Sequence, residues 1–187
     1  NDLAEMILVD LGILADTVIF NRTNLGVAKG YNRALALTTG THIVITGCDM
    51  LMSDGWLKTF VDYHEKIPNT GMACMYSKPL AECPERLRGP RQTVNGLDII
   101  PAFPVERRMF KRELLADFGY FPETFGLYGF DDLALAHRIE KVCAEKGLLC
   151  YLIPDHVPKH LGTEGVEAAN GNDSPEYHLF KRREVCD

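Results

Sequence analysis

One carboxylate follows a short stretch that has the composition of a buried strand. Residues 43–46 are β-branched and mostly apolar, which predicts a strand, and the chain then passes through Gly47 to Asp49. Open α/β sheets place ligand chemistry just beyond the carboxyl ends of their strands. We therefore predict that Asp49 holds a divalent metal on a nucleotide diphosphate. A plain turn is the alternative, because Gly and Asp are both common turn residues.

Two adjacent acids, Asp131 and Asp132, follow a Gly- and aromatic-rich loop and open a helix expected over residues 130–145. Acidic side chains in a first turn stabilise a helix by complementing its dipole, which is the structural explanation. The functional explanation is general-base catalysis, in which one carboxylate deprotonates an acceptor hydroxyl while its neighbour orients that hydroxyl.

Two histidines, His156 and His160, lie in a segment that Pro154 and Pro158 keep from being helical. One imidazole could complete a metal site with Asp49. The alternative is a pair of loop histidines with no ligand.

A polar turn before another expected helix holds candidate donor-binding residues. Gly26 allows close backbone approach to a ligand, Lys29 could add charge for a diphosphate, and Asn32 could pair with a base or ribose. Asn24 could cap the helix, so a capped amphipathic helix without a ligand explains much of the same pattern.

The elements that must position these side chains alternate along the chain. Helical spacing predicts helices over residues 2–14, 27–38, 107–118 and 130–145 and around Trp56, with Ser53 as an N-cap of the last. Apolar runs predict strands over residues 18–20, 43–46, 72–76, 97–103 and 148–153. Residues 78–95 show no period and are expected to be a long excursion. We expect an α/β protein with an open, mostly parallel sheet flanked by helices.

The composition, with 46% hydrophobic and 25% charged residues, is that of an ordinary soluble globular protein. The 187 residues carry a formal net charge of -6, which argues against a nucleic-acid partner. No apolar run has the length of a membrane span. The six cysteines include no C-x-x-C pair, so we interpret them as reduced thiols of a cytoplasmic protein, with peripheral membrane contact left open. We expect one domain over residues 1–187, with a polar tail over residues 168–187.

The three blocks, in this order, resemble family 2 glycosyltransferases of the GT-A fold, over about residues 1–163. The family's Asn-x-Gly segment and later Asn correspond to Asn24–Gly26 and Asn32. Its Asp-x-Asp metal motif falls on residues 47–49, where Gly47 replaces the first carboxylate. The family's first strand, which contacts the nucleobase, has no counterpart in this sequence.

The family's acidic catalytic block and late histidine also have counterparts. The Glu-Asp pair corresponds to Asp131 and Asp132, and His160-Leu-Gly resembles the late metal-binding histidine. The resemblance implies an inverting hexosyltransferase that uses a UDP- or GDP-sugar and a hydroxyl or glycan acceptor. It implies Asp132 as the base with Asp131 beside it, and Mn²⁺ or Mg²⁺ on Asp49 and His160. The donor-binding residues that it implies are Asn24, Gly26, Lys29, Asn32 and Cys48.

Two other functions stay open. The replacement of a metal-binding carboxylate by Gly47 fits a degenerate module that binds a sugar nucleotide or glycan without transfer. A nucleotidyltransferase also combines a metal with an α/β sheet, and would release pyrophosphate in place of a nucleoside diphosphate.

Overall fold

The computed structural model describes residues 17–47, 50–77, 84–127 and 129–160, without the side chain of His160. The helices are α2 Val27–Leu37, α3 Trp56–Lys66, α4 Leu115–Phe118 and α5 Asp131–Lys146, with short 3-10 turns at η2 Pro84–Arg86, η3 Arg112–Leu114 and η4 Glu123–Phe125. The strands are β1 His42–Ile45, β2 Met50–Leu51, β3 Thr70–Met75, β4 Gln92–Val94, β5 Leu97–Pro101, β6 Arg107–Lys111, β7 Leu149–Leu152 and β8 Lys159–His160.

Six of these strands form one open sheet in the order β1-β6-β3-β7-β5-β4, and β2 pairs with β8 in a separate ribbon. Only β3 and β7 pair in parallel, while the other pairings within the sheet are antiparallel. The expectation of a mostly parallel sheet was therefore wrong for the described residues. The reason is that β6 inserts between β1 and β3 in the opposite direction, and β5 does the same beside β7.

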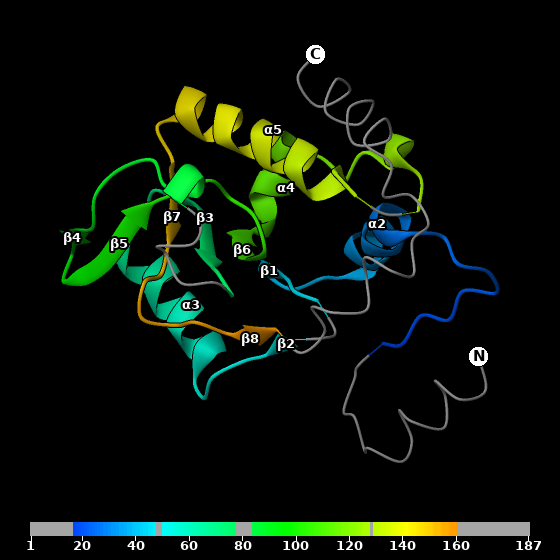
Figure 1. The fold of residues 1–187 in the computed structure, drawn as a ribbon, viewed down its shortest axis with the longest axis horizontal. Helices are drawn as coiled ribbons and strands as arrows, with labels where there is room; N and C mark the ends of the chain where they lie inside the picture. Colours follow the sequence, from blue (N-terminus) through cyan, green and yellow to red (C-terminus); the bar gives the residue numbers. More distant parts are fainter. Residues whose placement is uncertain (1–16, 48–49, 78–83, 128, 161–187) are drawn as a thin grey trace.

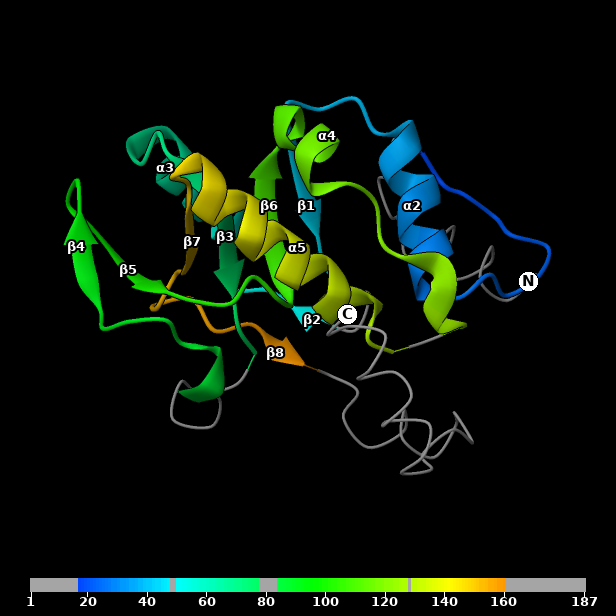
Figure 2. The same cartoon turned by 90° about the horizontal axis from the view of Figure 1, so that it is seen from above.

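Helices cover both faces of the sheet (Figures 1 and 2). Strand β3 shows why, because its side chains are buried on both sides. Met72 and Cys74 belong to the core beneath α2, α4 and α5, whereas Ala73 and Met75 belong to the core beneath α3. The period of two along this strand thus gives two hydrophobic cores, one on each face.

Several predicted elements are confirmed. Strand β1 and helix α5 lie where the sequence pattern places them, and β3 and β7 lie within one to two residues of the expected bounds. Helix α5 ends at Gly147, whose left-handed φ of 66° closes the last turn. The predicted helix over residues 2–14 and the polar tail over residues 168–187 lie outside the described residues.

The helix predicted over residues 107–118 was wrong for its first half. Residues Arg107–Lys111 form strand β6, and only Leu115–Phe118 form an α-helix. Met109 faces one core and Phe110 the other, which is the alternation of a central strand. Pairing with β1 and β3 on both sides overrides the helix propensity of this Arg- and Lys-rich segment.

Two further local predictions were wrong. Residues 18–20 form no strand, and Val18 and Phe20 are exposed. The excursion expected over residues 78–95 contains β4, which forms a hairpin with β5. Asn95 and Gly96 both have positive φ at this turn, so the Asn-Gly pair was the signal for the hairpin.

Candidate active site

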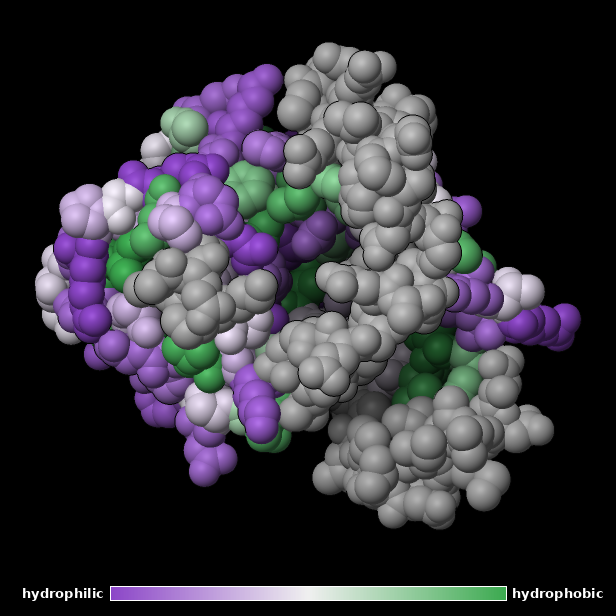
Figure 3. All heavy atoms as spheres, in the orientation of Figure 1, coloured by the Kyte–Doolittle hydropathy of each residue, from purple (hydrophilic) through white to green (hydrophobic). Residues whose placement is uncertain are grey.

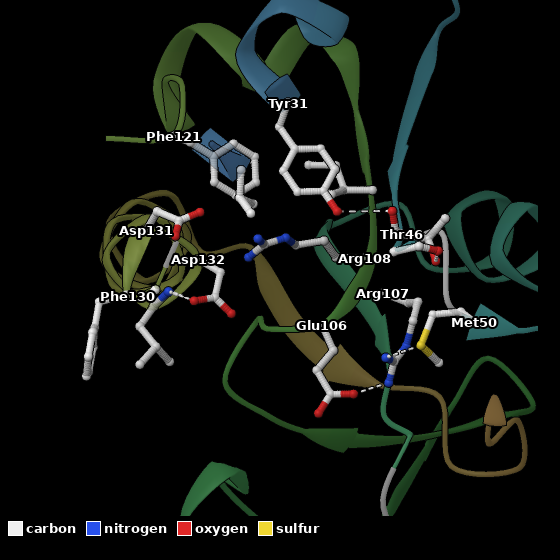
Figure 4. Close-up of a pocket in the computed structure, with 15 residues that line it drawn as sticks. Tyr31, Thr46, Met50, Glu106, Arg107, Arg108, Phe121, Phe130, Asp131 and Asp132 are labelled. Carbon is white, nitrogen blue, oxygen red and sulfur yellow. Dashed lines mark hydrogen bonds and ion pairs between the residues drawn. The ribbon is translucent and has the colours of Figure 1, made fainter. Parts of the chain in front are cut away.

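A cavity of about 380 Å³ lies at the carboxyl end of β1, where several elements far apart in the sequence meet (Figure 4). The face drawn in Figure 1 is hollowed near its middle in the space-filling view (Figure 3). The cavity is lined by Val27, Tyr31, Ile45, Thr46, Gly47, Met50, Glu106, Arg107, Arg108, Phe121, Gly129, Phe130, Asp131, Asp132 and Leu133.

The wall from β1 leads toward the predicted metal ligands. Thr46 and Gly47 line the cavity directly after the strand, and Met50 lines it two residues after Cys48. Cys48 and Asp49 lie outside the described residues, as does the side chain of His160. The backbone of His160 pairs with Met50 in the β2–β8 ribbon, so chain position 160 lies beside the residue that follows Asp49.

The wall opposite is the first turn of α5, which carries both predicted base candidates into the same cavity. Phe130 precedes the helix with a φ of 62° and provides no side-chain cap. Asp131 is buried at 4% exposure, whereas Asp132 is exposed and its Oδ1 accepts a hydrogen bond of 2.8 Å from the backbone N–H of Leu133. Of the two carboxylates, Asp132 is therefore the one that a solvent-borne acceptor can reach.

The floor is formed by charged residues at the start of β6 that the sequence reasoning missed. Glu106 has a φ of 63°, and its carboxylate forms ion pairs with Arg86 and Arg107. It also accepts a hydrogen bond of 2.9 Å from the backbone N–H of Ser77. Burial raises the pKa of Glu106, but the Ser77 N–H and the two guanidinium groups outweigh burial and hold it below the ordinary value.

Arg108 lies beside this ion-pair cluster without joining it. Its side chain is 2% exposed and lines the cavity between the aromatic wall and Asp132 (Figure 4). Its Nη1 donates a hydrogen bond of 2.9 Å to the carbonyl of Pro104, and its Cζ lies 5.2 Å from the centre of the Phe121 ring. The strand alternation around Met109 and Phe110 was the signal that could have placed Arg107 and Arg108 in a sheet.

The aromatic wall consists of Tyr31 and Phe121, whose rings stack with their centres 5.0 Å apart. The Tyr31 hydroxyl donates a hydrogen bond of 3.1 Å to the carbonyl of Thr46, which ties α2 to the end of β1. These contacts join the helix, the strand and the turn before η4 into one wall of the cavity.

Three of the predicted donor-binding residues near α2 lie outside the lining of the cavity. Gly26, with a φ of 81°, lies against the backbone of Leu127, where an added Cβ would come within 2.7 Å. Asn24 is not a helix cap, because the N-cap is Gly26 and the Asn24 Oδ1 accepts a hydrogen bond of 2.9 Å from the Gly26 N–H. Lys29 is exposed. The lining of the cavity includes none of these three, and their roles in donor binding stay predictions.

Asn32 holds the turn after α4. Its Oδ1 accepts a hydrogen bond of 2.8 Å from the Phe121 N–H, and its Nδ2 donates bonds of 2.9 Å to the Phe121 carbonyl and to Glu123. This amide is therefore committed to the backbone of a cavity-lining aromatic residue, and binding of a nucleotide by Asn32 stays a prediction.

His156 anchors the segment before β8. Its ring nitrogens lie 3.1 Å from Ser53 Oγ and 3.2 Å from Thr59 Oγ1. Ser53 is not the N-cap of α3, which is Gly55. His156 thus has a structural role without a ligand, because it fixes the loop to α3.

The described ranges contain no group of three or more His, Cys, Asp and Glu side chains arranged for a metal ion. That finding does not include Asp49 or the side chain of His160. Within the same ranges, no helix combines the length and the apolar character needed to cross a bilayer.

Comparisons with solved structures show the fold. The chain matches the mannosyltransferase PcManGT from Pyrobaculum calidifontis, solved with GDP-Man and Mn²⁺, at 23% identity and a TM-score of 0.60. It matches GalNAc-T7, solved with UDP, GalNAc and Mn²⁺, at 12% identity and a TM-score of 0.59. The alignments cover 99% and 100% of this chain but only 48% and 41% of those chains, so this chain spans less than half of their length.

A comparison with curated proteins found no match. The model of the family "Glycosyl transferase family 2" matches residues 17–125, which is more than half of the 187 residues. The match includes the end of β1, the charged start of β6 and the aromatic wall described above. The GT-A fold expected from the sequence is confirmed, and the chain belongs to glycosyltransferase family 2.

Proposed function

We propose that the protein is an inverting hexosyltransferase that moves a sugar from a nucleotide-sugar donor to a hydroxyl acceptor. The observation that carries this proposal is the shared cavity, because the end of β1 and the first turn of α5 line it from opposite sides. The strand end that leads to the predicted metal position thus lies across one cavity from the predicted general base.

Asp132 is the general base in this proposal. Its exposure at the cavity allows it to accept the proton of the acceptor hydroxyl while the acceptor oxygen attacks the anomeric carbon. Asp131 is buried beside it and contributes negative charge and orientation. Attack from the side opposite the leaving diphosphate inverts the configuration of the anomeric carbon.

The donor in this proposal is a UDP- or GDP-sugar, and the acceptor is a glycan or another hydroxyl compound. Asp49 and His160 would hold Mn²⁺ or Mg²⁺, which supplies positive charge to the leaving diphosphate when bound. A carboxylate ligand suits Mn²⁺ and Mg²⁺, and the β2–β8 pairing of Met50 with His160 supports the proximity of Asp49 and His160. The two solved structures named above hold a GDP- or UDP-type nucleotide with Mn²⁺, which supports the class of donor.

Substitution of Asp132 tests the proposal. Asp132→Asn should lower the transfer rate about 10²- to 10⁴-fold, because the amide cannot accept the proton. Binding of UDP or GDP, measured by calorimetry, should stay nearly unchanged. Asp62→Asn is the matched control, because Asp62 pairs with Lys58 on α3 and does not line the cavity.

Normal turnover by Asp132→Asn would refute the role of Asp132 as the base. The stereochemistry is a separate test, since NMR of the product should show the anomeric configuration opposite to that of the donor. Retention of configuration would contradict an inverting mechanism even if Asp132 proved essential.

A binding module without transferase activity is the second candidate. Gly47 favours it, because the metal motif keeps one carboxylate of its two. A protein of this kind would bind UDP- or GDP-sugars but show neither transfer nor hydrolysis with a panel of donors and acceptors, with or without Mn²⁺.

A further inference from the structure

Arg107 and Arg108 are consecutive on β6, and both are buried side chains that line the cavity, at 5% and 2% exposure. They differ in how their positive charges are compensated. Arg107 forms an ion pair with Glu106, and its Nε donates a hydrogen bond of 3.1 Å to the carbonyl of Met75. The charge of Arg107 is therefore already balanced by a carboxylate of the protein.

The charge of Arg108 is balanced less completely. Its guanidinium has the Pro104 carbonyl at 2.9 Å and the face of Phe121 at 5.2 Å, and its Nε has no hydrogen-bond partner among the described residues. Burial lowers the pKa of Arg108, and the negative charge of Asp132 is the largest effect in the opposite direction. A buried cation with an unused donor is costly unless an anion approaches it.

The position of Arg108 indicates which anion that is. The same cavity is lined by Gly47, which stands where the family's metal motif has its first carboxylate. One protein ligand for a cation that would neutralise the diphosphate is thus replaced by a residue without a side chain. A guanidinium group nearby can supply positive charge to the same phosphates, and its planar fork of donors suits phosphate oxygens.

We propose that Arg108 binds the diphosphate of the nucleotide donor and stabilises it as the leaving group. This inference rests on the proposed transferase function. In the transfer step, the bond between the anomeric carbon and the diphosphate oxygen breaks and its electron pair goes to the diphosphate. The acceptor oxygen forms the new bond to that carbon, its proton goes to Asp132, and a nucleoside diphosphate leaves in contact with Arg108.

Binding measurements with and without the phosphates test the inference. Calorimetry with UDP, GDP, uridine and guanosine, each in Mn²⁺ and in EDTA, should show tighter binding of a diphosphate than of its nucleoside to the wild type. Arg108→Gln should weaken diphosphate binding about 10- to 100-fold, as expected for loss of a hydrogen bond to a charged group, and most clearly in EDTA. Nucleoside binding should change little, and Arg108→Lys should fall between the two proteins.

Arg112→Gln is the matched control. Arg112 follows the same strand, but its side chain donates to the Gly40 carbonyl and to Thr38 Oγ1, away from the cavity. This variant should bind UDP and GDP like the wild type. Unchanged diphosphate binding by a folded Arg108→Gln would overturn the inference, and so would an equal loss of nucleoside binding. A wild type that binds none of the four compounds would overturn the proposed function itself.

A measurement on the wild type applies if the Arg108 variants do not fold. The ¹⁵N NMR signal of the Arg108 Nε should shift when UDP or GDP is added in EDTA, and should stay in place with uridine or guanosine. An unshifted Nε signal with a saturating diphosphate would overturn the role of Arg108 while leaving the transferase proposal standing.

Discussion

The cavity and the core beneath α3 bury polar side chains in opposite electrical states. At the start of β6, Arg107 and Arg108 carry charge while almost fully enclosed, and the Glu106 carboxylate beside them is mostly buried. Beneath α3, His64 is buried at 3% exposure, and burial lowers its pKa to about 4, so it is neutral near pH 7. The comparison teaches that this fold can keep a buried basic group uncharged, yet it retains buried charge around the cavity.

The difference arises from the partners that each region supplies. Around Glu106, two guanidinium groups and the Ser77 N–H and Oγ converge on one carboxylate. Around His64, the single hydrogen bond among described residues joins Nε2 to the Met109 carbonyl at 3.1 Å, and Nδ1 has none. Buried charge is stable only where such partners surround it, which fits a site prepared for a charged ligand.

Substitution of Glu106 should have the largest effect on stability. Glu106→Gln would leave Arg107 without its carboxylate and Arg86 with only the exposed Glu85, and removal of one partner from a buried pair costs up to about 3–5 kcal/mol of unfolding free energy. Urea denaturation at pH 7 measures this loss. Glu85→Gln is the control, because Glu85 is exposed and should lose less than about 1 kcal/mol. A similar small loss in Glu106→Gln would remove the contrast between the two regions.

Titration of His64 should have the next largest effect. Its folded pKa of about 4 lies below the ordinary value of 6.5, chiefly because of burial and in part because of the positive charges of His42 and Lys111, although the Met109 carbonyl acts in the opposite direction. Between these pH values the unfolded chain binds a proton that the folded chain does not. Stability should therefore fall as pH drops from 6.5 to 4, by on the order of 3 kcal/mol from this residue alone.

The measurement compares wild type with His64→Gln, whose amide can still donate to the Met109 carbonyl. The variant should lose less unfolding free energy over this pH range than the wild type. His137→Gln is the control, because His137 is exposed on α5 and should follow the wild type. Identical pH profiles for His64→Gln and wild type would show that the α3 region does not exclude charge. The stability from the ion pairs of Glu106 is lost only as pH falls through its folded pKa, which its partners hold below the ordinary value.

The elements with strong local patterns could be predicted from the sequence. Strand β1 has a run of β-branched apolar residues and helix α5 has helical apolar spacing, so the sequence alone predicts the two elements that carry Gly47 and Asp132. The resemblance to the family was based on the order of these motifs along the chain. The charged floor could not be predicted, because residues 107–118 have good helix formers and their strand conformation depends on β1 and β3, which are distant in the sequence.

The role of Asn32 shows a second limit of sequence reasoning. Asparagine is a poor helix former, so its place inside a helix favours a role beyond helix formation, such as binding a ligand. Its partner is Phe121, which is 89 residues away. No local sequence pattern predicts such a contact. A side chain that holds a cavity-lining residue in place has the same sequence signature as one that binds the ligand.

Substitution of Asn32 has the smallest expected effect on stability and separates these two roles. Asn32→Ala removes two hydrogen bonds to the Phe121 backbone and one to Glu123, so unfolding free energy should fall by about 1–2 kcal/mol. Asn69→Ala is the control, because Asn69 is exposed and should lose almost nothing. UDP and GDP binding should weaken only modestly, since Phe121 and the Arg108 guanidinium that lies over it would lose their fixed position. A large loss of affinity without a loss of stability would instead make Asn32 a ligand-binding residue. The cavity would then recognise its ligand through a neutral amide as well as through charged groups.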